Sequence, residues 1–331
     1  MKNKVTVIGA GNVGASTALY IAERGLADVT LIDRPEMDGM PQGKALDMEE
    51  AAPLWHKGVR MTGSTNLADV AGSDVVVMTA GFPRKPGMSR TDLLKANADI
   101  IKPAAEAVKQ YAPNAYVVVV TNPLDVMVWA FREFSGMPAH RVVGMAGVLD
   151  TARFKTFLGE ALNVSVENIS ALVLGGHGDT MVPITRLTNV SGIPLSELLP
   201  AEQIDAIVTR TQNGGAEIVK HLKTGSAYYA PSAATVEMVE SILKDKKKVL
   251  PCCALLEGEY GINGLFFGVP VKLGASGIEK VYEVQLNDTE KAAMAKSAAA
   301  VARKAGYTQV NVLSGGLKAW REANKPATKT P

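Results

Sequence analysis

The chain has 331 residues, which at roughly 100–200 residues per domain suggests two domains. Hydrophobic residues make up 47% and charged residues 21%, as in an ordinary globular protein. The 35 Lys and Arg residues nearly balance the 33 Asp and Glu residues, which leaves a net charge of +2. That balance predicts no basic surface for nucleic acid or for an anionic membrane. Any anion binding must therefore come from a few placed arginines.

Cysteine and histidine usage argues against cross-links and metal sites. The two cysteines, Cys252 and Cys253, are neighbours, which excludes an intrachain disulfide framework. The four histidines are scattered, and no Cys/His spacing is typical of a zinc site, so we expect no metal. Residues 5–8 form too short an apolar run for a signal peptide, and no run approaches the ~20 residues of a membrane span. We therefore expect a soluble, cytoplasmic protein with no nucleic-acid or membrane partner.

The first half of the chain alternates short apolar runs with helical patterns. The runs predict strands at Val5–Ile8, Val29–Ile32, Asp74–Thr79 and Tyr116–Thr121. Because they are almost continuously apolar, parallel strands covered on both faces are favoured. Apolar residues at helical spacing predict a helix between the first two strands, ending near Gly25, and another after Thr91, bent at Pro103. This alternation predicts an α/β fold with a doubly wound parallel sheet.

The pattern changes after about Val148. Helices are expected near 150–161, 204–223, 227–243 and 289–305, and strands near 169–174, 249–256 and 268–273. Pro183–Leu187 has a hairpin-like pattern, and Lys246-Lys247-Lys248 is interpreted as a solvated turn. This mixture predicts a second, α+β domain.

A glycine-rich turn is the strongest local motif. Gly9-Ala10-Gly11-Asn12-Val13-Gly14 directly follows the first predicted strand and opens the first predicted helix. Its glycines would allow a tight turn, close approach of the backbone to a pyrophosphate, and close helix–strand packing. Asp33 ends the second strand, 19 residues after Gly14, where a carboxylate would bind a ribose and repel a 2′-phosphate. A simple glycine turn and a strand-end Asp remain the alternative interpretation.

Two loops at predicted strand ends carry polar residues. The loop Gly81–Arg90 follows the strand at 74–79 and holds Arg84 and Arg90. It is either a mobile lid that brings cations over a ligand or a loop with solvated charges. Asn122-Pro123 closes the strand at 116–121, and a simple turn is the alternative there.

Two further patterns lie in the second half. Asp150 and Arg153 are three residues apart, on one face of a predicted helix, as in many surface ion pairs. His177 stands in Gly175-Gly176-His177-Gly178-Asp179 after an apolar strand. An isolated His is often structural, but flanking glycines would let a substrate approach it.

Taken together and in this order, these motifs resemble the lactate/malate dehydrogenases over roughly residues 1–300. The likeness is greatest to the malate-specific, lactate-dehydrogenase-like bacterial group. The resemblance implies a Rossmann domain followed by an α+β catalytic domain, with NAD as cofactor and reversible oxidation of (S)-malate to oxaloacetate. It also implies a homodimer or homotetramer.

The resemblance assigns roles residue by residue. His177 would exchange the proton of the substrate hydroxyl, and Asp150 would hold the other imidazole nitrogen. Arg153 would bind the C1 carboxylate, while Arg90 and Asn122 would polarise the reacting oxygen. The implied cofactor contacts are Gly9, Ala10, Gly11, Asn12, Val13, Gly14, Asp33, Asn97, Val120, Thr121 and Asn122.

Arg84 is the residue that the resemblance links to the substrate. A further cation in a closed pocket suits a second carboxylate, and it would be stranded opposite the methyl group of pyruvate. Ala227, on the segment Gly225–Pro231, would leave room for the larger substrate. Lactate or another 2-hydroxy acid is the alternative within this class. A catalytically inactive NAD-sensing protein is the alternative from another class, and the complete set of catalytic side chains argues against it.

The C-terminal residues depart from the family pattern. Residues 306–331 resemble the last strand, loop and helix of a rhodanese-like sulfurtransferase domain, but without its cysteine-bearing loop. We therefore expect an NAD-binding domain at 1–148, a catalytic domain at 149–305 and an atypical extension at 306–331.

Overall fold

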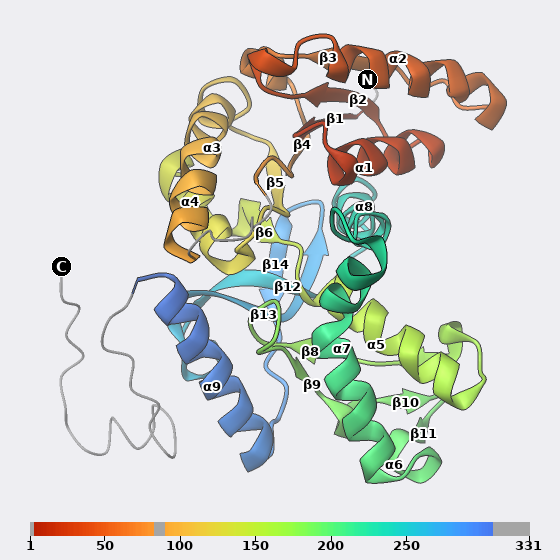
Figure 1. Ribbon diagram of the computed structural model, residues 1–331. Coiled ribbons are helices and arrows are strands. Elements are labelled where there is room, and N and C mark those ends of the chain that lie inside the picture. The colour runs from red at the N-terminus through yellow and green to blue at the C-terminus, as the bar shows by residue number, and fades with distance from the viewer. Residues whose placement is uncertain (1–2, 83–89, 307–331) are drawn as a thin grey trace.

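The protein is described here by a computed structural model over residues 3–82 and 90–306, with the side chains of Arg90 and Thr91 left out of the description. Its centre is a sheet of nine strands (Figure 1). Six parallel strands lie in the order β3 (Met61–Ser64), β2 (Asp28–Ile32), β1 (Lys4–Ile8), β4 (Val75–Met78), β5 (Tyr116–Val119) and β6 (Val142–Gly144). The predicted doubly wound α/β sheet is confirmed, and all four predicted strands are present.

Chain order reverses between β1 and β4, which lie side by side although β2 and β3 come between them in the sequence. The carboxyl ends of parallel strands share one edge of a sheet, and such a reversal leaves a crevice there. The Gly9–Gly14 turn follows β1, Asp33 follows β2, and Asn122 follows β5. The topology therefore gathers these three motifs along one edge.

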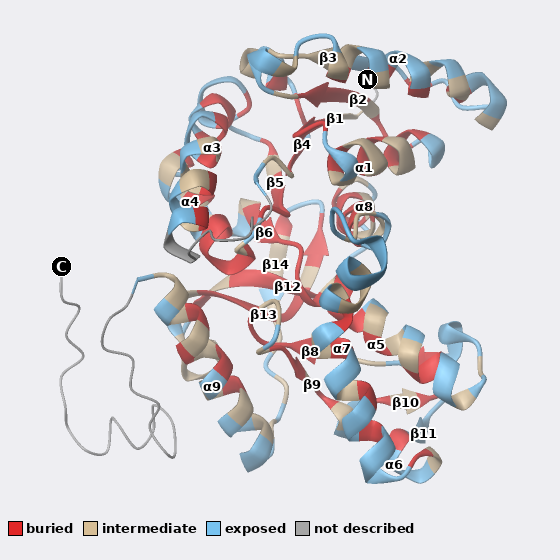
Figure 2. Ribbon diagram, in the orientation of Figure 1, coloured by how far each residue is buried: buried red, intermediate tan, exposed pale blue. Residues whose placement is uncertain are grey.

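Helices cover both faces of the parallel strands. Contacts place α1 (Asn12–Glu23) against α8 (Tyr229–Leu243), and α3 (Arg90–Tyr111) against α4 (Leu124–Ser135), while α2 (Met40–Ala51) packs on β3. Val75 and Val77 belong to one apolar core, whereas Val76 and Met78 belong to another, because alternate residues of a strand point to opposite faces. Figure 2 shows the parallel strands of the central sheet as largely buried.

Three antiparallel strands extend the same sheet beyond β6. They are β12 (Lys248–Glu257), β13 (Asn263–Gly274) and β14 (Gly277–Val281). Cys253 of β12 pairs with Gly144 of β6, so strands from the two halves of the chain form one continuous sheet. The predicted strands at 249–256 and 268–273 are confirmed, but their membership of the central sheet was not predicted.

The remaining elements form a smaller layer around a third apolar core. Contacts pair α5 (Gly147–Leu162) with α7 (Ala201–Leu222), and α6 (Leu195–Leu198) packs nearby. The predicted strand at 169–174 is instead two strands, β7 (Ile169–Ser170) and β8 (Val173–Leu174), which belong to different sheets. Each pairs with a different partner, β10 (Asn189–Val190) and β9 (Val182–Pro183) respectively.

The prediction of a hairpin at Pro183–Leu187 was wrong. Pro183 ends β9, and Thr185–Leu187 is a single 3₁₀ turn. The hairpin of this region lies further on, where β10 pairs with β11 (Ile193–Pro194) through Ser191 and Gly192, both with positive φ. These are the conformations that a tight turn requires.

The last described helix, α9 (Asp288–Lys304), packs against α4, β9 and β13. Among the described residues, no helix is long and apolar enough to cross a membrane. Nor does that part of the chain hold a cluster of three or more side chains able to bind a metal ion.

Candidate active site

The glycine-rich turn has the geometry of a phosphate cradle. Gly9 has φ +108°, and a Cβ at Gly14 would lie 1.7 Å from the Gly9 carbonyl oxygen, so both positions require glycine. A Cβ at Gly11 would meet no atom within 4 Å. Gly11 is the N-cap of α1 and makes no side-chain cap, so the first N–H groups of this helix are available to an anion. The open space at Gly11 thus leaves room for an anionic group beside these N–H groups.

Asp33 closes one side of this cradle. One carboxylate oxygen accepts a hydrogen bond of 2.7 Å from the Ala10 N–H, and the other accepts one of 2.8 Å from the Arg34 N–H. The side chain is 13% exposed, so its remaining lone pairs are accessible at the end of β2. Lys44 donates to the Ala10 carbonyl oxygen at 2.7 Å and tethers the turn to α2. This arrangement fits the two hydroxyls of an adenosine ribose.

Asn97 and Thr121 tie neighbouring loops together. The Asn97 amide accepts from the Phe82 N–H at 2.8 Å and donates to the Asn122 carbonyl oxygen at 2.7 Å. It also donates to the Phe82 carbonyl oxygen at 3.2 Å and is 1% exposed. Thr121 donates to the Ala80 carbonyl oxygen at 2.7 Å. These buried side chains bind protein backbone, whereas Asn122 is exposed at the edge of the sheet.

His177, Asp150 and Arg153 meet around one buried carboxylate. His177 Nδ1 lies 2.9 Å from Asp150 Oδ2, and Arg153 Nη1 lies 3.4 Å from Asp150 Oδ1. The Asp150 side chain is 2% exposed, against 16% for His177. The prediction that Asp150 and Arg153 share a helix face is confirmed, but this is no surface ion pair, because α5 places both in the interior.

Burial and charge set the protonation of this group. Burial acts to lower the pKa of His177, but the charge of Asp150 and its hydrogen bond outweigh that effect and raise the pKa above its ordinary value of 6.5. Burial lowers the pKa of Arg153, which the Asp150 charge partly offsets. Because an arginine stays protonated in any such setting, the group carries a fixed cation beside a titratable imidazole.

Arg153 lies against two consecutive glycines of α7. A Cβ at Gly214 would lie 3.3 Å from Arg153 Cδ, and one at Gly215 would lie 3.7 Å from Nη2. The Arg153 Nε is buried without a hydrogen-bond partner in the described structure. A buried donor without a partner is costly, so it favours an acceptor supplied by a ligand.

The comparisons with known proteins cover almost the whole described chain. Residues 3–144 match the NAD binding domain of lactate/malate dehydrogenase, and residues 147–305 match its alpha/beta C-terminal domain. The chain belongs to the lactate/malate dehydrogenase family. NAD is the cofactor of this family's first domain, and the turn at Gly9–Gly14 with Asp33 fits it.

Relatives within the family include both substrate types. The malate dehydrogenase of Chlorobium phaeovibrioides is 58% identical over 299 residues, which are 90% of this chain and 96% of that protein. The solved malate dehydrogenase of Picrophilus torridus is 48% identical, with a TM-score of 0.89 over 92% of this chain and 97% of that one. The lactate dehydrogenase of Cryptosporidium parvum, solved with lactic acid and NAD, is 44% identical with the same TM-score and the same coverage. The family fold alone therefore does not select the substrate.

Some predicted site residues lie outside the description. Arg84 falls in the undescribed segment 83–89, and Arg90 is described only through its backbone at the start of α3. Ala227 is half-buried just before α8, whose Ser232 lies 2.8 Å from the Val13 carbonyl oxygen. That contact brings the predicted pocket segment next to the helix of the cofactor turn.

Asp125 is the residue that sequence reasoning missed. It lies in the first turn of α4 and is 5% exposed, and its Oδ2 would lie 3.5 Å from a Cβ at Gly176, the residue before His177. The thiol of Cys253 donates to its Oδ1 at 3.5 Å. The sequence did contain one indication of this residue. Asp125 is the single acidic residue in the apolar run Leu124–Ala130, three residues after Asn122.

Proposed function

We propose that the protein is a malate dehydrogenase that reversibly oxidises (S)-malate to oxaloacetate with NAD. The observation that carries this proposal is the buried Asp150 carboxylate, which holds His177 and Arg153 together. The identity of 58% to the Chlorobium phaeovibrioides malate dehydrogenase supports the choice of substrate. When bound, the nicotinamide ring supplies the hydride acceptor or donor.

His177 serves as the acid/base group. Because Asp150 occupies Nδ1, the proton exchanged with the substrate is carried by Nε2. Asp150 fixes the ring orientation and stabilises the imidazolium that forms when the hydroxyl proton is taken up. In the reverse direction, the same nitrogen returns the proton to the carbonyl oxygen.

Arg153 holds the C1 carboxylate of the substrate. Its planar guanidinium suits bidentate binding of a carboxylate, and its buried Nε lacks an acceptor that a ligand could supply. Asn122 is exposed at the end of β5 and donates to the reacting oxygen. Arg90 has the same role in this proposal, which rests for that residue on the family motif.

Arg84 selects the dicarboxylate. The proposal places its guanidinium against the distal carboxylate of malate, where pyruvate or lactate would leave the charge stranded. A lactate dehydrogenase is the second candidate, which the Cryptosporidium parvum structure supports at 44% identity. Ala227 stays part of the proposed pocket as a small residue that leaves room for the larger substrate.

The cofactor contacts are proposed for the turn Gly9–Gly14, for Asp33, and for the loop residues Val120, Thr121 and Asn122. Asn97 is proposed to act with them by holding the loops in place, since its amide bonds to the backbone of Phe82 and Asn122.

No metal is part of this proposal. The reaction needs none, because proton transfer and charge stabilisation are both assigned to side chains.

The test is NADH oxidation, followed by absorbance, with oxaloacetate and then with pyruvate. A malate dehydrogenase consumes NADH with oxaloacetate far more efficiently than with pyruvate, and a lactate dehydrogenase shows the reverse. An NAD-sensing protein binds NADH but turns over neither. Efficient turnover of pyruvate alone, or no turnover with bound NADH, would overturn the proposal.

The assembly is proposed to be a homodimer or homotetramer. Large apolar side chains are exposed on helices next to α1, with Leu46 57% and Leu54 80% exposed around α2, and Tyr229 62% exposed at the start of α8. Large exposed apolar side chains on neighbouring helices favour an interaction surface, and a subunit interface is the one proposed here. Light scattering after size-exclusion chromatography gives the subunit count, and a monomer at micromolar concentration would contradict the proposal.

The same proposal covers domain limits and location. The family matches meet between residues 144 and 147, which supports a boundary near 148 and a catalytic domain that ends at 305. Residues 306–331 are proposed to be an extension outside the dehydrogenase, and 307–331 lie outside the described structure. Cys252 and Cys253 are buried free thiols, as is usual in the reducing cytoplasm, which fractionation of cells would test.

A further inference from the structure

The helix α7 carries two adjacent glycines in its interior, at the level of Arg153. The residues that α7 buries become smaller along the helix: they are Ile204, Ile207, Thr211 and Gly214. Gly215 follows directly and is also helical. Glycine is unfavourable inside a helix, because it loses more conformational freedom on folding than alanine does. A pair of glycines within a helix of 22 residues therefore indicates a packing or functional reason.

The side chain of Arg153 in α5 supplies the packing reason. A Cβ at Gly214 would lie 3.3 Å from Arg153 Cδ, closer than the about 3.5–4.0 Å of a favourable carbon–carbon contact. A Cβ at Gly215 would lie 3.7 Å and 3.9 Å from the terminal nitrogens Nη2 and Nη1. The first glycine thus borders the aliphatic arm of the arginine, and the second borders its guanidinium. Because neither has a side chain, the backbone of α7 forms one wall of the arginine's site.

The glycines also leave the guanidinium without a competing side chain. Within the described residues, its Nη1 has Asp150 as hydrogen-bond partner at 3.4 Å, and its buried Nε has none. The Arg153 side chain is 14% exposed, so its other donors have little access to water. A guanidinium in this state favours a bidentate acceptor such as a carboxylate. A side chain at position 215 would compete with such a ligand for the space beside the two terminal nitrogens.

A second contact between the same two helices keeps the glycines in register with Arg153. The guanidinium carbon of Arg210 lies 4.0 Å from the ring centroid of Phe157, and a Cβ at Gly214 would lie 3.7 Å from the same ring. Phe157 follows Arg153 in α5 by about one helical turn, and Gly214 follows Arg210 in α7 by about one turn. The two contacts therefore lie one above the other along the interface between α5 and α7.

Two glutamates fix the side chain of Arg210 in this place. Its Nη1 pairs with Glu160 of α5 at 2.8 Å. Its Nε and Nη2 donate to the two carboxylate oxygens of Glu217 of α7 at 3.1 Å and 3.0 Å. One arginine thus bonds to both helices, which resists sliding of α7 along α5.

We propose that Gly214 and Gly215 are positioning residues for Arg153, and that the contact of Arg210 with Phe157 holds them in place, so that the guanidinium presents a fixed pair of donors to the C1 carboxylate of the substrate. This inference rests on the proposed role of Arg153. Oxaloacetate and pyruvate share the C1 carboxylate, so the positioning residues act on both oxo acids alike. In this they differ from Arg84, which is proposed to contact the distal carboxylate alone.

The decisive variant is Gly215→Ala, and Gly214→Ala is a second probe of the same wall. The matched control is Gly43→Ala in α2, where the new methyl group would meet no atom within 4 Å. Each full-length variant is assayed for kcat and KM with oxaloacetate and with pyruvate. Calorimetry with NADH present measures the Kd for oxamate, an unreactive analogue of pyruvate with the same carboxylate. Fluorescence titration gives the Kd for NADH, and urea titration gives the unfolding midpoint.

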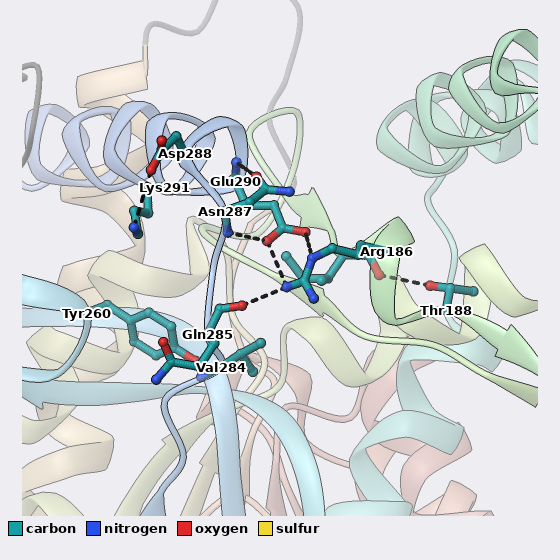
Figure 3. Close-up of polar contacts among 10 residues, drawn as sticks. Arg186, Thr188, Tyr260, Val284, Gln285, Asn287, Asp288, Glu290 and Lys291 are labelled. Atoms are coloured by element: carbon teal, nitrogen blue, oxygen red, sulfur yellow. Dashed lines mark hydrogen bonds and ion pairs between the residues drawn. The ribbon is translucent and has the colours of Figure 1, made fainter. Parts of the chain in front are cut away.

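The contact of Arg210 is tested by Arg210→Ala, with Arg186→Ala as its control. Figure 3 shows Arg186 bonded to Glu290 and to the Gln285 carbonyl oxygen at the start of α9. The two arginines are matched in exposure, at 42% for Arg210 and 44% for Arg186, and each pairs with glutamate. Only Arg210 lies at the interface between α5 and α7.

We expect Gly215→Ala to lower kcat/KM for oxaloacetate and for pyruvate by the same factor, about 10- to 100-fold and chiefly through KM, since a displacement near 1 Å can cost that much. The Kd for oxamate rises in parallel, and the Kd for NADH stays the same. The urea midpoint does not fall, because alanine favours a helix more than glycine does. Gly214→Ala and Arg210→Ala lower kcat/KM in the same way, while both control variants keep it.

A purely structural role of the glycines gives a different result. It predicts a lower urea midpoint with an unchanged Kd for oxamate. That outcome would overturn the inference, and so would a loss of kcat/KM for one oxo acid only. An effect of Arg210→Ala no larger than that of Arg186→Ala would remove Arg210 from the positioning residues.

Arg153→Lys keeps this test apart from the proposed function, because lysine retains the charge but not the planar pair of donors. If Arg153→Lys loses kcat/KM for both oxo acids while the glycine variants behave as wild type, the positioning inference fails and the proposed function stands. If Arg153→Lys retains near-normal kcat/KM, the assignment of Arg153 to the C1 carboxylate fails, and the inference that rests on it fails as well.

Discussion

The Nδ1 atom of His177 lies 2.9 Å from Oδ2 of Asp150, on a carboxylate that is almost completely withdrawn from solvent. This contact occupies Nδ1 and leaves Nε2, the second ring nitrogen, as the atom that is proposed to exchange a proton with the substrate. It also raises the pKa of His177 above 6.5, against the opposing effect of burial. Several measurable consequences depend on that balance.

The pH dependence of the two reaction directions follows from the raised pKa of His177. Reduction of oxaloacetate needs the imidazolium, so kcat/KM for reduction falls as pH rises through that pKa, above 6.5. Oxidation of malate needs the neutral ring and rises over the same interval. Steady-state kinetics from pH 5.5 to pH 9 checks this, and two limbs that move in the same direction would contradict the assignment. Asp150→Asn weakens the stabilisation of the imidazolium and shifts both limbs to lower pH.

Gly11 and Gly14 of the proposed cofactor turn should respond differently to substitution by alanine. At Gly11 the φ is −67° and the space is open, so Gly11→Ala leaves stability within about 0.5 kcal/mol but weakens NADH binding, because the new methyl group occupies the pyrophosphate position. Gly14→Ala creates an overlap with the Gly9 carbonyl oxygen and costs on the order of 3 kcal/mol in unfolding free energy. Urea titration and fluorescence titration with NADH measure the two effects. If Gly11→Ala and the wild type bind NADH with equal affinity, the pyrophosphate does not bind next to Gly11.

Asp33 should make the enzyme prefer NADH to NADPH. Its carboxylate accepts a hydrogen bond from the Ala10 N–H at the position proposed for the adenosine ribose, where it would repel a 2′-phosphate. Asp33→Ser removes the charge and should raise kcat/KM with NADPH. The difference in kcat/KM between NADH and NADPH should therefore become smaller. The measurement is kcat/KM for each cofactor at saturating oxaloacetate. Equal kcat/KM values with both cofactors in the wild-type enzyme would show that Asp33 does not discriminate between a ribose hydroxyl and a 2′-phosphate.

Arg84→Gln should shift the substrate preference from oxaloacetate toward pyruvate. Breaking a desolvated charge pair costs ~3–5 kcal/mol, and about 1.36 kcal/mol is tenfold in rate. The ratio of efficiencies for oxaloacetate and pyruvate should therefore change by two orders of magnitude or more, with a loss for oxaloacetate and a gain for pyruvate. Lys85→Gln, next to it in the sequence, is the matched control for loss of a loop charge. A ratio that stays within about threefold of wild type would favour a solvated charge at Arg84 and leave the substrate open.

Asp125 should make stability depend on pH in a defined direction. Its pKa is raised from 3.8 to about 6 in the folded protein, so the proton is bound more tightly in the folded state. The resulting stabilisation is complete below pH 3.8 and is lost as pH rises through 6. Relative to Asp125→Asn, wild type should therefore lose about 2–3 kcal/mol of unfolding free energy between pH 4 and pH 8. Denaturant titrations at both pH values measure the unfolding free energy of each protein. If the difference between the two proteins is the same at both pH values, folding does not raise the pKa of Asp125.

The residue pattern alone determined the parallel half of the fold. Strands such as 75–78 are apolar at every position because helices cover both faces, and that local property is visible without any tertiary information. The glycine pattern is also visible in the sequence: Gly9 adopts a positive φ that favours glycine, and Gly14 leaves no room for a side chain. The roles expected of His177, Asp150 and Arg153 came from the family motif, because local spacing alone equally suggested a surface ion pair.

Only the tertiary structure decided what surrounds those residues. The continuation of the sheet through β12 to β14 depends on pairing between Cys253 and Gly144, which no local pattern encodes. The split of 169–174 into two sheets depends on partners after residue 181. The Asn97 amide is engaged by backbone groups of two loops, a fact of packing rather than of composition. Asp125 of α4 and Ser297 of α9 both approach Gly176, next to His177, because long-range packing brings those helices together, and contacts between residues that far apart in the sequence leave no trace in local spacing.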